Sequence, residues 1–378
     1  MRPKFEEGGK LHAFHSLFDA MDTFFYTPEQ TTVSGCHIRD AVDNKRTMFT
    51  VIIALIPALL FGMYNIGYQH YLSLGQVSCY CDNFWGNLGY GFLKILPMLL
   101  VSYIVGLGIE CIFAQIRKHE VSEGYFVTGM LIPLICPPDV PLWQLAIAVA
   151  FAVIIGKEVF GGTGYNFLNP ALVARAFLFF SYPSQMSGDT VWIAEQGDAI
   201  SGATPLGEML AGGVAPQASV LDMFLGFIPG SVGETSVIAI LIGAVILLVT
   251  GIASWRIMFS IFAGGAAMGL VFNMIGANPY MEMPFYYHFL IGGFMFGAVF
   301  MATDPVTAAQ TNTGKYIYGA LIGIMAVLIR VLNPAYPEGM MLSILLLNVF
   351  APLIDYYVVD ANIRRRAKRA KLLVKNNQ

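Results

Sequence analysis

Long apolar runs constrain this chain more than any other feature. A transmembrane helix needs roughly 20 mostly apolar residues, and seven runs approach or exceed that length. They lie at 47–67, 86–113, 140–156, 235–254, 257–276, 316–332 and 339–359. Only 12% of the 378 residues are charged, whereas roughly 25% is typical of soluble domains. The sequence therefore predicts an all-α polytopic membrane protein.

Three further apolar runs are short and contain, or lead into, glycine and proline: 124–136, 167–182 and 287–303. They are predicted to be broken or half-length helices, which brings the total to about ten transmembrane helices and places both termini on one side. The blocks 124–156 and 287–332 resemble each other but face opposite sides. This pattern is typical of an inverted repeat, in which half-length helices border a central ion or substrate site.

Lysine and arginine are unevenly distributed between the loops. The alternate loops that contain neither residue are 68–85, 183–234, 277–286 and 333–338. The other loops and both termini are basic, and cytoplasmic loops near a membrane are enriched in these residues. We therefore expect a cytoplasmic N-terminal segment (1–46), a transmembrane domain (47–359) with an outward loop at 183–234, and a basic cytoplasmic tail (360–378). Nothing in the charge pattern indicates a nucleic-acid surface.

Lys94, Arg175 and Arg330 fall within the apolar runs. The simplest interpretation of Lys94 and Arg330 is that their side chains extend to a membrane interface. Five cysteines form no disulfide or zinc pattern. We interpret Cys111 and Cys136 as small packing residues.

Glu110, Asp304 and Asp355 are acidic residues at membrane depth or beside broken spans. Burying a carboxylate in a membrane is costly, so each is a candidate functional group. Carboxylates next to backbone loosened by glycine or proline suit Na⁺, which prefers oxygen ligands. The alternative is that each one caps a helix or pairs with a basic loop residue.

The glycine-rich segment 157–170 is the most unusual part of the sequence. Its glycines permit tight turns, and Asn166 and Asn169 are expected on one face of the following helix. Two amides at membrane depth can hydrogen-bond a planar heterocycle that has both donors and acceptors. The alternative is that they join helices to one another, as asparagine commonly does in membranes.

The outward loop contains Asp198, Ser201, Gly202, Ala203 and Thr204 in the order Asp-x-x-Ser-Gly-Ala-Thr. This string resembles the motif at which flavin transferases attach FMN to threonine through a phosphodiester. We expect Thr204 to lie in an exposed loop without a packing role.

Together these features resemble the NqrB proteins of the Na⁺-translocating NADH:quinone oxidoreductases and the related RnfD proteins of the Rnf electron-transport complexes. The resemblance covers nearly the whole chain. Besides the Ser-Gly-Ala-Thr string, it is carried by FYTP (25–28), HIRDAVDNKR (37–46), KHEVSEGYFVT (118–128), the segment 157–189 and TDPVTAAQTN (303–312).

The resemblance implies a six-subunit complex of the bacterial inner membrane that oxidises NADH, reduces quinone and exports Na⁺. The five other subunits (A, C, D, E and F) would be the partners, and they would supply the NADH site and the iron-sulfur centres. A flavin transferase would attach FMN covalently to Thr204 on the periplasmic side.

The resemblance also assigns roles to residues within the membrane. It implies noncovalent riboflavin at Asn166 and Asn169, and a quinone region at Gly106 and Gly108. It associates the carboxylates of Glu110, Asp304 and Asp355 with Na⁺ passage.

Two other functions remain open from the sequence alone. A protein of the RnfD type would share the FMN but receive electrons from a different partner. A secondary transporter without a redox role would share the broken helices and contain no flavin.

Overall fold

The computed structural model describes residues 18, 32–36, 44–76, 79–117, 124–195, 202–212, 218–333 and 338–376. All regular elements in these ranges are helical. Six helices are long and apolar enough to cross a membrane. These findings confirm the prediction of an all-α polytopic membrane protein.

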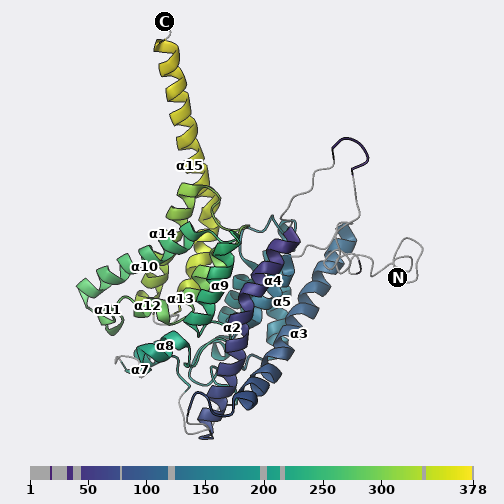
Figure 1. The fold of residues 1–378 in the computed structure, drawn as a ribbon, viewed down its shortest axis with the longest axis vertical. Helices are drawn as coiled ribbons and strands as arrows, with labels where there is room; N and C mark the ends of the chain where they lie inside the picture. Colours follow the sequence, from purple (N-terminus) through teal and green to yellow (C-terminus); the bar gives the residue numbers. More distant parts are fainter. Residues whose placement is uncertain are drawn as a thin grey trace.

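The six long helices form most of the body in Figure 1. They are α2 (Asn44–Ser73), α3 (Phe84–Arg117), α5 (Leu142–Gly156, extended by the 3-10 turn η3, Glu158–Phe160), α10 (Trp255–Ile275), α14 (Asn312–Leu332) and α15 (Met340–Asn376).

The predicted short and broken runs are confirmed. Two of them are the helices α4 (Gly124–Ile135) and α6 (Pro170–Ser181). The third is divided into α12 (Tyr287–Leu290), α13 (Phe294–Phe296) and the π-helix η5 (Gly297–Met301). The remaining short elements are η4 (Pro183–Gln185), α7 (Pro205–Gly212), α8 (Val220–Leu225) and α11 (Pro279–Glu282).

The run at 235–254 was expected to be a full-length span, and this prediction is wrong. The helix there, α9, covers only Val237–Val249. Ser236 begins it by accepting a hydrogen bond from the Ala239 N–H through its hydroxyl. The chain turns at Gly251, whose φ is +72°, a conformation that glycine adopts without strain. Local capping therefore shortens a run whose composition favours a longer helix.

Glycines let the backbones of α10 and α14 approach closely. A Cβ atom at Gly323 would lie 2.1 Å from the Ile261 carbonyl oxygen, and one at Gly264 would lie 2.3 Å from that of Ala320. Larger side chains at these positions would push the two helices apart. Small residues at helix contacts are typical of membrane proteins, where dispersion and shape replace the hydrophobic effect between helices.

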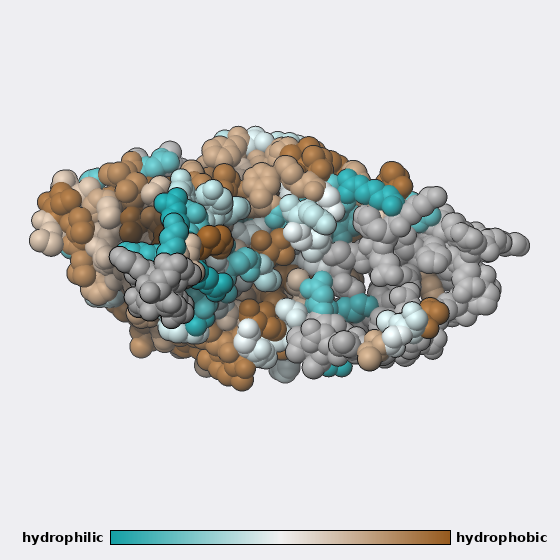
Figure 2. Space-filling model, turned by 90° about the horizontal axis from the view of Figure 1, so that it is seen from above, coloured by the Kyte–Doolittle hydropathy of each residue, from teal (hydrophilic) through white to brown (hydrophobic). Residues whose placement is uncertain are grey.

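Large apolar side chains face outward along the body. Leu93, Ile104 and Ile112 of α3 are 61% to 69% exposed. In Figure 2, hydrophobic residues predominate along the margin of the coloured part, while hydrophilic residues lie mainly toward the middle. This distribution suits a bundle that is surrounded by lipid.

The two ends of the bundle differ in charge. We call the end at which α2 begins and α15 leaves the body the basic end, because Lys45, Arg46 and Arg117 lie there. α7 and α8 lie toward the opposite end (Figure 1). α15 continues as one helix to Asn376 and projects beyond the body, so the predicted last span and basic tail form a single element.

Lys94 and Arg330 were both expected to reach an interface, and only Lys94 does so. Its side chain is 26% exposed and pairs with Glu195 at 2.8 Å. Arg330 is 1% exposed and donates hydrogen bonds to the carbonyls of His288 and Ile291. The prediction for Arg330 is therefore wrong, because the break between α12 and α13 leaves carbonyls inside the bundle that need a donor.

Candidate functional site

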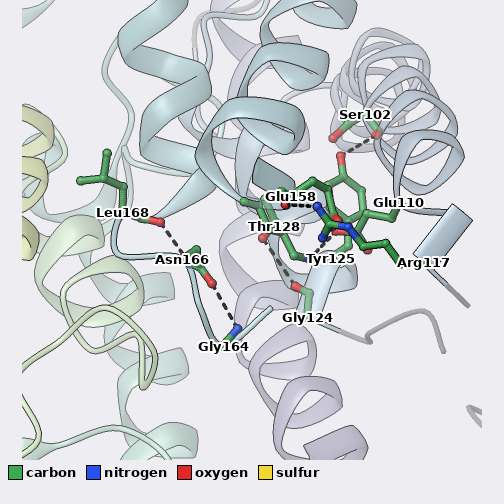
Figure 3. Close-up of polar contacts among 11 residues, drawn as sticks. Ser102, Glu110, Arg117, Gly124, Tyr125, Thr128, Glu158, Gly164, Asn166 and Leu168 are labelled. Atoms are coloured by element: carbon green, nitrogen blue, oxygen red, sulfur yellow. Dashed lines mark hydrogen bonds and ion pairs between the residues drawn. The ribbon is translucent and has the colours of Figure 1, made fainter. Parts of the chain in front are cut away.

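The loop between α5 and α6 bends through three glycines with positive φ: Gly161 (+121°), Gly162 (+95°) and Gly164 (+97°). Asn166 stabilises the end of this bend (Figure 3). Its Oδ1 accepts from the Gly164 N–H at 3.3 Å, and its Nδ2 donates to the Leu168 carbonyl at 3.0 Å. The Asn166 amide is thus held by the backbone of its own loop.

Asn169 has a different role. It is the N-cap of α6, and its Oδ1 accepts hydrogen bonds from the N–H groups of Ala171 and Leu172. Pro170 at the first helical position fixes the start of the helix. The expectation that Asn166 and Asn169 share a face of this helix is therefore wrong, because both precede it. Neither makes a side-chain bond to another helix among the described residues.

Two buried charge pairs lie beside this loop. The ammonium of Lys157, at the end of α5, contacts the carboxylate of Glu110 from α3, and each side chain is only 3% exposed. Arg117 donates to the Glu158 carbonyl at 2.7 Å and lies 3.4 Å from its carboxylate (Figure 3). Two carboxylates and two cations therefore meet near the basic end of α3.

Tyr125 packs between these charges and α3. Its hydroxyl donates to the Ser102 carbonyl at 2.8 Å. A Cβ at Gly106 would lie 1.8 Å from the Tyr125 oxygen, so only glycine fits there, whereas a Cβ at Gly108 would meet no atom within 4 Å. Gly106 thus has a packing role, while Gly108 faces outward.

A narrow cavity, here called the inner cavity, opens beside the glycine-rich loop. Its lining includes Lys157, Thr163, Asn166, Asn169 and Asp304. Its volume is about 70 Å³. The hydroxyl of Thr163 is buried without a hydrogen-bond partner, and the amide nitrogen of Asn169 has none among the described residues. The cavity thus offers polar groups to a ligand.

The three candidate Na⁺ carboxylates lie on separate elements. Glu110 is on α3 and Asp355 on α15. Asp304 follows η5 and accepts hydrogen bonds from the Val306 N–H and the Thr307 hydroxyl. Asp355 accepts from the N–H groups of Gln310 and Thr311 and so holds the loop before α14. No cluster of three or more His, Cys, Asp or Glu side chains suited to a metal occurs in the described part.

Thr204 is half-buried and not the exposed loop residue that was expected. Its Oγ1 accepts from the Gly207 N–H at 3.2 Å and its carbonyl from the Glu208 N–H at 2.9 Å, so it caps the start of α7. Gly202 and Ala203 before it are buried. The motif residues Asp198 and Ser201 lie outside the described residues.

Thr204 borders a second, wider cavity, here called the outer cavity. It has a volume of about 330 Å³, and its lining includes Trp192, Thr204, Leu206, Glu234, Gly293 and Glu338. The lining is mainly apolar, with acidic groups from two loops. This volume lies in the range of about 300–1,000 Å³ that is usual for small-molecule pockets.

The wall of the outer cavity is built on the broken helix. A Cβ at Gly293 would lie 2.8 Å from the Glu234 carboxyl carbon. Glu234 therefore lies at the start of α13, where a negative charge is favourable, and Arg330 binds the carbonyls before the break. Arg175 of α6 bonds Ser231 and Glu338. Sequence reasoning missed Glu234 and Glu338, although each is a lone acid next to glycine in a lysine-free loop.

Charge pairs also stabilise the surface of the end opposite the basic end. Hydrogen bonds from Lys94 and Tyr90 hold the pKa of Glu195 below its ordinary value. A hydrogen bond from Tyr80 lowers the pKa of Asp222 and raises that of Tyr80 to about 12. These acids therefore stay ionised at neutral pH.

Comparison with known proteins identifies the family. The model of the NQR2, RnfD, RnfE family matches residues 31–364. The chain belongs to this family. Three relatives, each named as a subunit (type B) of the Na⁺-translocating NADH-quinone reductase, match this NQR2, RnfD, RnfE protein over nearly its whole length. They come from Ectopseudomonas mendocina (51% identical, 97% of this chain and 96% of the relative), Chromohalobacter salexigens (51%, 98% and 95%) and Pseudomonas aeruginosa strain LESB58 (50%, 97% and 96%).

Proposed function

We propose that this chain is the B-type subunit of a Na⁺-translocating NADH-quinone reductase and carries FMN on Thr204. The observation that carries the proposal is the position of Thr204 at a helix start on the rim of the outer cavity. The three relatives named above, matched from end to end, support the assignment to this complex.

The surroundings of Thr204 suit a covalent flavin phosphate. The free N–H groups at a helix start favour a negative charge, and α7 begins directly after Thr204. The outer cavity offers a mainly apolar wall to the ring system, with Ser231, Glu234 and Thr235 as polar groups. When bound, the flavin supplies the redox chemistry, while the protein fixes its position and electrostatic surroundings.

Substitution of Thr204 tests this proposal. Thr204→Ala removes the attachment oxygen, and we expect complete loss of the flavin fluorescence that follows the denatured chain in gels. Thr204→Ser keeps both the hydroxyl and the cap and is the matched control for folding. A Thr204→Ala chain that still fluoresces after denaturation would exclude Thr204 as the attachment residue.

We also propose the inner cavity as the site of a noncovalent riboflavin. The unpartnered Thr163 hydroxyl and the Asn169 amide nitrogen fit the donor and acceptor edge of a flavin. The volume of about 70 Å³ does not accommodate the ring system, so binding requires the loop before α6 to move away from residues 303–306. Riboflavin extracted per mole of wild-type chain tests the site, and a content near zero would contradict it.

The quinone proposal concerns the basic half of α3. Gly106 is committed to packing against Tyr125, whereas Gly108 is exposed. If quinone binds along this face, Gly108→Ala should raise the KM for quinone without loss of assembly. An unchanged KM would place the quinone elsewhere.

We propose that Glu110, Asp304 and Asp355 serve Na⁺ passage from the basic end, which would face the cytoplasm of a bacterial inner membrane. Both termini would then be cytoplasmic, and Thr204 would face the periplasm. Conversion of Glu110 to Gln should raise the Na⁺ concentration for half-maximal turnover, because the carboxylate oxygen charge is lost. Unchanged Na⁺ dependence would remove Glu110 from the path.

The five partner subunits (A, C, D, E and F) would deliver the electrons, and a flavin transferase would attach the FMN. The relatives named above favour this complex over an Rnf-type complex or a transporter without a redox role, because all three are reductase subunits. Reduction of Thr204-bound FMN by NADH, in the purified complex, separates the first from the other two.

A further inference from the structure

The buried contact between Lys157 and Glu110 occupies the carboxylate that we assign to Na⁺ uptake. Both side chains are 3% exposed, and buried charges persist in proteins when they are paired. A sodium ion could reach the Glu110 oxygens only by displacing the Lys157 ammonium or sharing the carboxylate with it.

We propose that Lys157 is a tethered counter-ion that competes with Na⁺ for the Glu110 carboxylate. The inference rests on the proposed Na⁺ role of Glu110 and specifies how that site is kept closed. In this view the ammonium occupies the site in the absence of Na⁺ and leaves it when a sodium ion arrives.

The displaced ammonium has a second polar environment within its own surroundings. Lys157 also lines the inner cavity, where it is the one lysine or arginine among the described lining residues. Asp304 and Asn166 line the same cavity. A cavity of about 70 Å³ has room for about two water molecules, so a lysine side chain can turn into it.

The charges in this region favour uptake of one cation. Glu110, Lys157 and Asp304 comprise two carboxylates and one ammonium, and Asp304 has no basic partner among the described residues. One sodium ion at Glu110, with Lys157 turned toward Asp304, pairs every charge. Arg117 does not fill this role, because it is bound to Glu158.

Arg117 therefore provides a matched control for a test on the assembled complex. Lys157→Met removes the competing charge, keeps the length of the side chain, and should lower the Na⁺ concentration for half-maximal quinone reduction by about tenfold, within the usual range of coupling between two sites. Lys157→Arg retains the charge and should stay within about twofold of wild type. Arg117→Gln removes a nearby cation that does not contact Glu110 and should also leave this concentration unchanged.

A measurement on the wild-type complex tests the same inference without turnover or substitution. If Na⁺ displaces the ammonium, acylation of Lys157 by a small amine reagent, followed by peptide mass spectrometry, should increase with Na⁺ and not with K⁺. This measurement decides the matter if Lys157→Met fails to assemble.

The outcomes separate this inference from the function on which it rests. If Glu110→Gln leaves the Na⁺ dependence unchanged, the Na⁺ role of Glu110 and the inference both fail. If Glu110→Gln raises the Na⁺ requirement while Lys157→Met leaves it unchanged or raises it, competition alone is excluded. Labelling of Lys157 that does not respond to Na⁺ also overturns the competition.

Discussion

The outer and inner cavities differ in size and in how their charges are held. The outer cavity has a volume of about 330 Å³, and Glu234 and Glu338 in its wall are placed by a helix start and by Arg175. The inner cavity has a volume of about 70 Å³ and contains the lysine of a buried ion pair. The first is ready to receive a large ring, whereas the second must rearrange before it can.

The same contrast applies to the ion pairs at the two ends. Lys157 and Glu110 are each 3% exposed, whereas Lys94 and Glu195 are 26% and 64% exposed. Water screens the second pair but hardly reaches the first. The loss of one partner should therefore have very different consequences at the two ends.

The largest expected effect is at the inner pair. Glu110→Gln leaves the Lys157 ammonium buried without its carboxylate, which typically costs about 3–5 kcal/mol. The double variant Glu110→Gln with Lys157→Met removes both charges and should recover most of that loss. Thermal unfolding of the purified complex measures both. A double variant as unstable as the sum of the single ones would show that the two charges do not interact.

A smaller effect is expected at Asn169. Asn169→Ala removes the N-cap of α6 and should cost about 1 kcal/mol, while Asn169→Asp keeps the capping oxygen and removes the amide donor. If the amide binds riboflavin, Asn169→Asp should contain less extractable riboflavin at nearly unchanged stability and with a full complement of covalent FMN. Equal riboflavin in the Asp variant and the wild type would assign Asn169 to capping alone.

The smallest effect is expected at the outer pair. Lys94→Met should cost less than about 1 kcal/mol, because the pair is exposed. The pKa of Glu195 is lowered in the folded protein from an ordinary value of 4.5. Its contribution is therefore complete above that value and is lost as the pH falls through the lowered pKa. The difference in melting temperature between wild type and Lys94→Met should shrink with it, and a difference that grows on acidification would contradict this.

Much of the fold could be predicted from the sequence, because spans depend on local composition. The short runs at 124–136, 167–182 and 287–303 are short or broken in the structure. The length of α9 could not be predicted, because its ends are set by one serine hydroxyl and one glycine turn within an apolar run.

The candidate site could be predicted less completely. The motif identified Thr204, but its capping of α7 and the adjacent cavity depend on where the loop folds back. Asn166 and Asn169 were found from a glycine-rich segment, yet a proline at 170 starts the helix after them. The contact of Lys157 with Glu110 joins positions 47 residues apart, and no local pattern encodes such pairing.

The most direct test of the central claim is the mass of the intact wild-type chain, purified from its native membrane. The account predicts a chain heavier than its sequence by one FMN less one water, with the added mass on the peptide that contains Thr204. The same chain with Thr204→Ala should have the mass of its sequence alone. An unmodified wild-type chain, or FMN on another residue, would contradict the account.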